Sequence, residues 1–158
     1  SSDLGTTEIV PCGKLKYAGE KREMPVNPLA NCNVDGYKTT NGAVRTGCFT
    51  TTKQKRQYTG KSYYQIGELS GNVLERCITL GNSKGRQFTG LHGDGEISTS
   101  GKANVAYWPD SDALGVGFRG GSWHNETDGI TVSLRQFACY TSTKKFDSYG
   151  FRAVRSAE

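Results

Sequence analysis

Residues suited to ligand recognition gather near the C-terminal end of the chain, between Gly115 and Arg155. The middle of this stretch is rich in Asn, Asp, Ser, Thr and aromatic residues, which is loop composition with recognition chemistry. Tyr and Phe provide large contact area at low entropic cost, and the small polar residues provide adaptable hydrogen bonds. We expect one ligand-binding surface, made by His124, Asn125, Thr127, Asp128, Gln136, Phe137, Tyr140, Thr141, Ser142, Lys144, Phe146, Asp147, Ser148 and Tyr149.

The charge and the aromatic residues of this stretch allow two interpretations. Lys144 and Lys145 would steer acidic ligands toward a binding surface. The alternative is a solvated loop whose aromatic rings, such as Phe137 and Phe146, are tucked into the core. Because exposed aromatic residues mark interfaces, we prefer the binding surface.

The cysteines point to structure more than to chemistry. They are Cys12, Cys32, Cys48, Cys77 and Cys139, and no pair has the C-x-x-C spacing of a zinc knuckle or a redox motif. An odd count leaves at least one thiol free or bonded to another chain. We expect most of them to be buried small hydrophobic residues, and one or two disulfides if the protein is exported.

Composition places the chain among glycine-rich single domains. The 158 residues correspond to one domain, and 21 glycines predict many turns and much irregular structure. The formal charge of +5 favours acidic partners, but the basic residues are scattered and nucleic acid is not expected. No apolar run approaches a membrane span. The polar start, Ser1-Ser2-Asp3, indicates a domain cut from a longer protein.

Two apolar, glycine-hinged motifs bracket the polar stretch and should position it. The first reads Gly-Phe-Arg-Gly-Gly-Ser-Trp up to Trp123, and the second reads Gly-Phe-Arg and includes Phe151. We expect both motifs to be strands, with Trp123 and Phe151 anchoring the core. A further buried strand is predicted over Val73–Leu80, and an edge strand over Lys14–Tyr17. No window has sustained helical spacing of apolar residues, so long helices are not expected.

Three motifs in this order carry a resemblance. They are Gly71-Asn72-Val73-Leu74-Glu75-Arg76, then Gly120-Gly121-Ser122-Trp123, then Gly150-Phe151-Arg152. From about Tyr63 to the end, the chain resembles the formylglycine-generating-enzyme-like domain, a variant of the C-type lectin fold. Leu74 and Arg76 stand where that family has tryptophans. The resemblance implies an α+β protein with a C-type lectin fold and much irregular structure, over residues 1–158 as a single domain.

The resemblance also bears on catalysis. Oxidising members of the family carry a copper-binding cysteine pair just after the Gly-Gly-Ser-aromatic motif. Here that place reads His124-Asn125-Glu126-Thr127-Asp128-Gly129, and Cys139 stands alone. Iron-dependent relatives use a histidine cluster, whereas only His92 and His124 occur here. A non-enzyme is therefore expected, with a metal-dependent oxidase of the same family as the alternative.

Variable proteins of diversity-generating retroelements share this fold, and their variable segment lies between the same two brackets. Adenine-directed mutagenesis of their codons yields residues such as Asn, Ser, Thr, Asp, Tyr and Phe, but not Lys or Gln. Most residues from Phe137 to Tyr149 fit, whereas Gln136, Lys144 and Lys145 do not. The resemblance implies a diversified domain on a cell surface or phage particle that binds a protein or glycan of another cell or virus. A fixed structural domain of a surface protein is a second alternative.

Some relatives bind calcium at positions that match Asn72 and Glu75. Amide and carboxylate oxygens suit calcium, but two side chains fall short of the ligand number that the ion requires. The alternative is that Asn72 caps a turn and that Glu75 pairs with an arginine such as Arg119 or Arg152. We expect no cofactor apart from this possible structural calcium.

Overall fold

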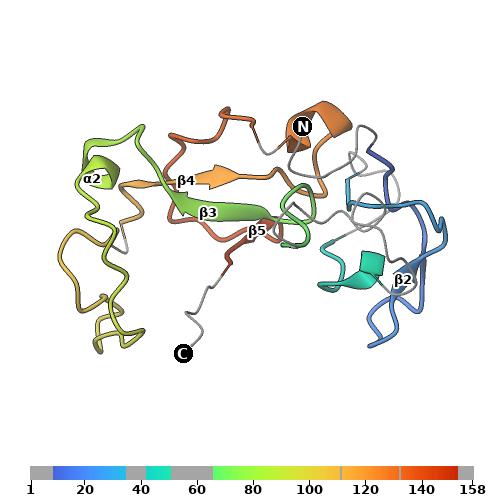
Figure 1. Ribbon diagram of the computed structural model, residues 1–158, viewed down its shortest axis with the longest axis horizontal. Coiled ribbons are helices and arrows are strands. Elements are labelled where there is room, and N and C mark those ends of the chain that lie inside the picture. Colours follow the sequence, from blue (N-terminus) through green and yellow to red (C-terminus); the bar gives the residue numbers. More distant parts are fainter. Residues whose placement is uncertain (1–8, 35–41, 51–65, 111, 132, 153–158) are drawn as a thin grey trace. The chain divides into compact units, whose positions relative to one another are not determined.

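The structure is a computed structural model that describes residues 9–34, 42–50, 66–110, 112–131 and 133–152. Tyr63, where the resemblance begins, and residues 153–158, where it ends, lie outside these residues. Most of the described chain is irregular, with short strands and a few single helical turns (Figure 1). This confirms a small mixed α and β protein. No helix among the described residues is both long and apolar enough to span a membrane.

The strands form two small sheets. Strand β1 (Leu15–Lys16) pairs antiparallel with β2 (Met24–Pro25), which confirms the predicted edge strand. Pro25 is compatible with β2 because a two-stranded sheet has only edge strands. In the other sheet, β3 (Leu74–Ile78) lies between β4 (Val116–Arg119) and β5 (Tyr149–Gly150). β3 runs parallel to β5, with Leu74 opposite Tyr149.

Both brackets of the polar stretch therefore contain strands, as predicted. The first bracket contains β4 and the second contains β5, and the strand predicted over Val73–Leu80 is the shorter β3. The described helices are α2 (Ser83–Arg86) and the 3-10 turns η1 (Cys48–Thr50) and η2 (Thr127–Ile130). Asn82 caps α2, because its side-chain oxygen accepts a hydrogen bond from the backbone N–H of Lys84.

The chain divides into two compact units. Unit 1 contains Ser1–Glu75, Gly120–Leu134 and Phe146–Gly150, and unit 2 contains Arg76–Arg119, Arg135–Lys145 and Phe151–Glu158. Three of the five boundaries fall within β3 and at the ends of β4 and β5, and the other two fall after Leu134 and after Lys145. Because the polar stretch crosses these boundaries, its residues are distributed over both units.

The core of unit 1 is built from small clusters. One consists of Cys12, Ala30, Val44, Cys48 and Phe49, and the other of Cys32, Val34 and Ile130. Trp123 is also buried, which confirms its predicted place in the core. Three of the five cysteines are thus interior residues, whereas Cys139 is exposed.

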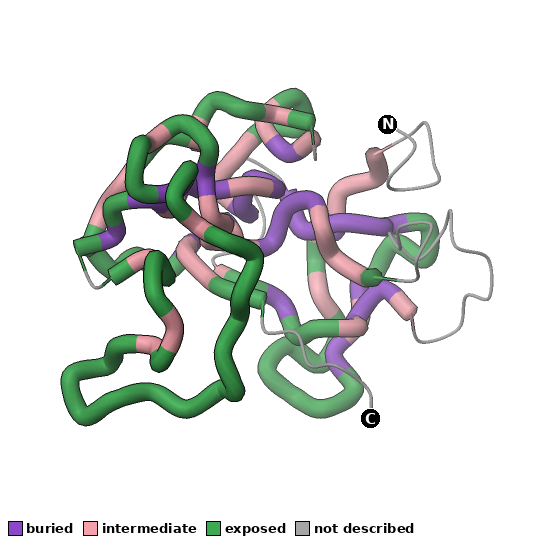
Figure 2. Tube along the Cα trace, turned by 60° about the vertical axis from the view of Figure 1, so that its left-hand side comes forward, coloured by how far each residue is buried: buried purple, intermediate pink, exposed green. Residues whose placement is uncertain are grey.

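Phe151, the other predicted anchor, is not in the core, since 81% of it is exposed. β5 ends at Gly150, so Phe151 follows the last paired residue and no strand covers it. In unit 2 the buried ring belongs instead to Phe118 of β4. Residues 89–102 are exposed throughout, and Figure 2 shows long exposed stretches of this kind beside the buried segments.

The buried thiols predict how stability depends on alkaline pH. Burial, followed by the nearby Cys12, raises the pKa of the Cys32 thiol to about 12, and burial likewise raises the pKa of the Cys48 thiol to about 12. Unfolded cysteine loses its proton at lower pH. The folded state therefore holds the proton more tightly, and its stability falls from about pH 9 toward pH 12.

We expect each of these thiols to contribute a slope of about −1.4 kcal/mol per pH unit in that window. Urea unfolding of the wild type and of Cys32→Ala at pH 8 and pH 10 measures it. Cys32→Ala should lose the contribution of the Cys32 thiol to this slope. Cys139→Ala, which alters an exposed thiol, should keep the wild-type slope. Equal slopes for all three proteins would contradict the burial effect.

Candidate ligand-binding surface

The Gly-Gly-Ser-Trp motif follows β4 and is fastened to the turn before β3. The Gly71 N–H donates to the Gly120 carbonyl at 2.7 Å, and the Trp123 N–H donates to the Asn72 carbonyl at 3.0 Å. Gly121 has φ of +67°, and a Cβ there would lie 2.5 Å from the Gly129 carbonyl oxygen. Only glycine fits this position, which explains the second glycine of the motif.

In unit 1, the predicted surface residues after Trp123 are partly structural. The His124 ring packs edge-on against Trp123 with centroids 3.7 Å apart, and its Nε2 lies 3.5 Å from Oδ1 of Asp147. The Asn125 side-chain oxygen accepts hydrogen bonds from the N–H and the hydroxyl of Ser122. The side chains of Thr127 and Asp128 are exposed on η2.

The end of the polar stretch, in unit 1, also contains both exposed and buried side chains. The rings of Phe146 and Tyr149 meet edge-on at 5.0 Å, and half of Phe146 is exposed. Ser148 is buried, and its carbonyl accepts a hydrogen bond from the Leu74 N–H at 2.7 Å. The side chain of Ser148 is therefore not on the surface, and this residue instead joins the end of the stretch to β3.

Two members of the predicted surface in unit 2, Phe137 and Tyr140, lie beside β4. The Phe118 N–H donates to the Phe137 carbonyl at 2.9 Å, and the Tyr140 ring lies 6.3 Å from Phe118 and 6.4 Å from Phe137. Phe137 is half-buried, whereas 47% of Tyr140 is exposed. Gln136 and Lys144 are exposed, and Thr141 and Ser142 are half-buried.

The structure thus brings together some of the predicted residues and not others. His124 meets Asp147, and Phe146 meets Tyr149, within unit 1. Phe137 meets Tyr140 within unit 2. The exposed side chains in the two units are candidates for contact with a ligand: Thr127, Asp128, Gln136, Tyr140, Lys144, Phe146 and Asp147.

Asn72, one of the two predicted calcium ligands, has its side chain occupied by the protein. It is buried, and its Oδ1 accepts hydrogen bonds from the Val44 N–H at 2.8 Å and from the Asn33 amide at 3.1 Å. Its own amide donates to the Val44 carbonyl. An amide oxygen with both lone pairs taken does not fit a calcium ligand in this arrangement. Glu75 lies half-buried in β3.

The described residues contain no other cluster of metal-ligand side chains. No three His, Cys, Asp or Glu side chains in that part of the chain are grouped so that they could hold a metal ion. His92, in its glycine-rich segment, instead packs edge-on against Phe88 and Trp108, with ring centroids at 5.5 and 5.7 Å.

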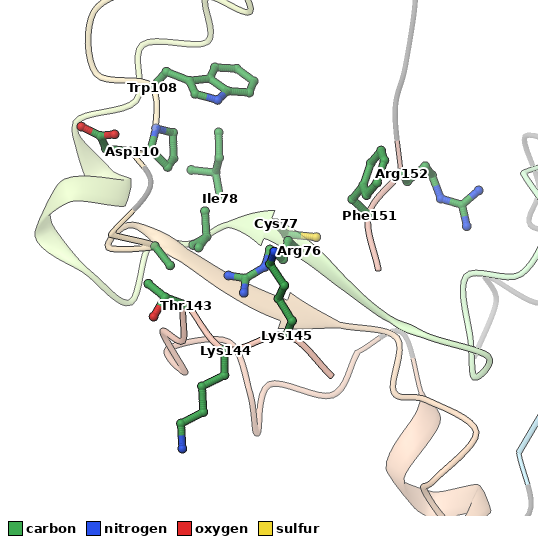
Figure 3. Close-up of a pocket in the computed structure, with 13 residues that line it drawn as sticks. Arg76, Cys77, Ile78, Trp108, Asp110, Thr143, Lys144, Lys145, Phe151 and Arg152 are labelled. Atoms are coloured by element: carbon green, nitrogen blue, oxygen red, sulfur yellow. The ribbon is translucent and has the colours of Figure 1, made fainter. Parts of the chain in front are cut away.

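Unit 2 contains a pocket that the sequence does not reveal. It has a volume of about 580 Å³, and its lining comes from β3, from residues around Trp108 and Val116, and from residues 143–145 and 151–152 (Figure 3). Lys144 of the predicted surface lies in this lining, and so does Lys145, which was predicted to steer acidic ligands. Arg76, a lining residue, stands where the family that the sequence resembles has a tryptophan.

Comparison with known proteins identifies no relative of this chain. No protein-family model, no curated protein and no solved structure matches the chain.

Proposed function

We propose that this chain is a non-catalytic ligand-binding display domain with a C-type lectin fold of the formylglycine-generating-enzyme-like type. Residues 124–149 would carry a diversified binding surface, as in the variable proteins of diversity-generating retroelements. The ligand would be a protein or glycan of another cell or virus, and the domain would be displayed on a cell surface or a phage particle.

One observation carries the proposal: the segment between two short strands exposes aromatic side chains. β4 and β5 both flank β3, and the described residues between them contain only the single turn η2 as regular structure. Tyr140 and Phe146 are about half exposed in this segment. Aromatic rings offer large contact area at low entropic cost, and loops held by a rigid scaffold commonly carry binding residues, so this arrangement favours binding.

Tolerance to substitution tests the display role. Tyr140→Ser and Phe146→Ser should each lower the free energy of unfolding by about 1–2 kcal/mol, because about half of each residue is already exposed. Tyr140 loses its ring contacts with Phe118 and Phe137, and Phe146 loses its ring contact with Tyr149. The matched control is Phe118→Ser, whose ring is buried in β4 and whose loss should destabilise the protein far more. Urea unfolding measures all three, and equal losses would place the two rings in the core and contradict display.

The two alternatives make different predictions for the same proteins. A fixed structural domain predicts that Tyr140→Ser or Phe146→Ser changes the oligomeric state seen by light scattering and leaves ligand capture intact. A metal-dependent oxidase predicts that the purified protein contains stoichiometric copper or iron. Either result would replace the display proposal.

A further inference from the structure

We infer that the pocket of unit 2 binds an organic carboxylate, that is, a carboxylate group attached to an apolar body. The inference deepens the proposed binding function and rests on it, since Lys144 belongs both to the proposed binding surface and to the pocket. The pocket of about 580 Å³ lies in the range of small-ligand sites.

The charges of the pocket favour an anion. Its lining contains four cations, Arg76, Lys144, Lys145 and Arg152, and the carboxylate of Asp110. That carboxylate already forms an ion pair with Lys102 at 2.9 Å, so it offsets little of the positive charge inside the pocket. The pocket would therefore attract an acidic group more strongly than a neutral group.

Arg76 is the cation best placed to hold the acidic group. Its Nη2 donates to the Ser142 carbonyl, and its guanidinium lies over the Phe118 ring at 4.7 Å from the ring centroid. These two contacts orient a planar fork that has five N–H donors. In Figure 3 the guanidinium of Arg76 and the side chain of Lys145 reach toward the middle of the pocket, whereas the charged ends of Lys144 and Arg152 point outward.

The rest of the lining suits an apolar body. Ile78, Val116 and Ala113 supply aliphatic surface, and the rings of Trp108 and Phe151 stand at the rim in Figure 3. Trp108 is supported by edge-on contacts with Phe88 and His92. A planar carboxylate on Arg76 would leave its attached group against these side chains.

The described lining of the pocket lacks the backbone features that are typical of a nucleotide-phosphate site. Nucleotide phosphates are typically cradled by glycine-rich backbone and helix N-termini. The lining residues that the structure describes include no glycine and no residue of α2. The positive charge of the lining comes from side chains and not from backbone N–H groups. The carboxylate would come either from a free small molecule or from an acidic side chain of a protein ligand.

Calorimetric titration of the whole chain separates these possibilities. Phenylbutyrate represents the free carboxylate, N-acetyl-phenylalanyl-glutamyl amide represents an acidic side chain beside a ring, and phenylbutanol and phenyl phosphate are the comparison probes. At least one carboxylate probe should bind about tenfold or more tightly than phenylbutanol, because it makes charge-assisted hydrogen bonds. The carboxylate probe that binds more tightly identifies the source of the carboxylate, a free small molecule or an acidic side chain. Equal binding of phenylbutanol, tighter binding of phenyl phosphate, or no binding of either carboxylate would overturn the inference.

Variants connect binding to the pocket. Lys145→Gln, at an exposed position, and Arg76→Gln should each weaken carboxylate binding, with about a tenfold loss for Arg76→Gln. Lys16→Gln removes the same charge from exposed β1 of unit 1 and should bind like the wild type. If Arg76→Gln does not fold, Lys145→Gln decides alone, and wild-type affinity in it would overturn the inference. Failure here would leave the display proposal standing if Tyr140→Ser and Phe146→Ser behave as predicted.

Discussion

Asn72→Ala should lower the free energy of unfolding by about 4 kcal/mol, which is the largest effect we expect from a single polar side chain here. The substitution removes three hydrogen bonds that the Asn72 side chain makes inside unit 1. Their partners are the Val44 N–H, the Val44 carbonyl and the Asn33 amide. It also places alanine at φ of +65°, a left-handed conformation that asparagine tolerates better. Both effects act on the turn that fastens Trp123.

Two further variants separate these effects. Asn72→Gly removes the same hydrogen bonds but accepts the positive φ, so it should be about 1 kcal/mol more stable than Asn72→Ala. Asn27→Ala removes an exposed asparagine that accepts one hydrogen bond, from the Leu29 N–H, and should cost about 1 kcal/mol or less. Urea unfolding with and without added calcium measures all of them. Stabilisation of the wild type by calcium, lost in both Asn72 variants, would restore Asn72 as a calcium ligand.

Gly117→Ala should cost about 3 kcal/mol, at the upper end of what overpacking does. Gly117 lies in β4, and a Cβ there would overlap the carbonyl of Ala138. Because the obstacle is backbone, no side-chain rotation can relieve it, and the segment around Phe137 must move away from β4. The neighbouring hydrogen bond from the Phe118 N–H to the Phe137 carbonyl would weaken with it.

The matched control is Gly67→Ala, since a Cβ at Gly67 has no atom within 4 Å and the backbone there has no positive φ. That variant should be as stable as the wild type, or slightly more stable, because alanine restricts the unfolded chain. Thermal unfolding compares the two proteins. A wild-type melting temperature for Gly117→Ala would show that the segment is not held closely against β4.

The parts of the fold that the sequence predicted well are those set by local pattern. Apolar runs beside glycines identified β3, β4 and β5, and the size of Trp123 identified a core residue. Phe151 was wrongly placed in the core, because a pattern does not distinguish the last paired residue of a strand from the residue after it.

The candidate site was less predictable because it depends on contacts between distant segments. The Asn72 side chain bonds Val44, 28 residues earlier in the chain, which no local motif reveals. Arg76 reaches the Ser142 carbonyl from 66 residues away, and the pocket beside it is lined by four separate segments. The composition of residues 124–149 predicted recognition chemistry, but it did not separate exposed Tyr140 from buried Ser148.

Sequencing of the DNA around the gene tests whether residues 124–149 form a diversified binding surface. We predict a reverse transcriptase gene and a near-copy of the segment that encodes Gly117–Arg152, differing from it at adenines. The differing codons should include those of the exposed Tyr140, Phe146 and Asp147 and should spare that of the buried Trp123. A locus with neither a near-copy nor a reverse transcriptase would contradict the claim and leave a fixed binding or structural domain.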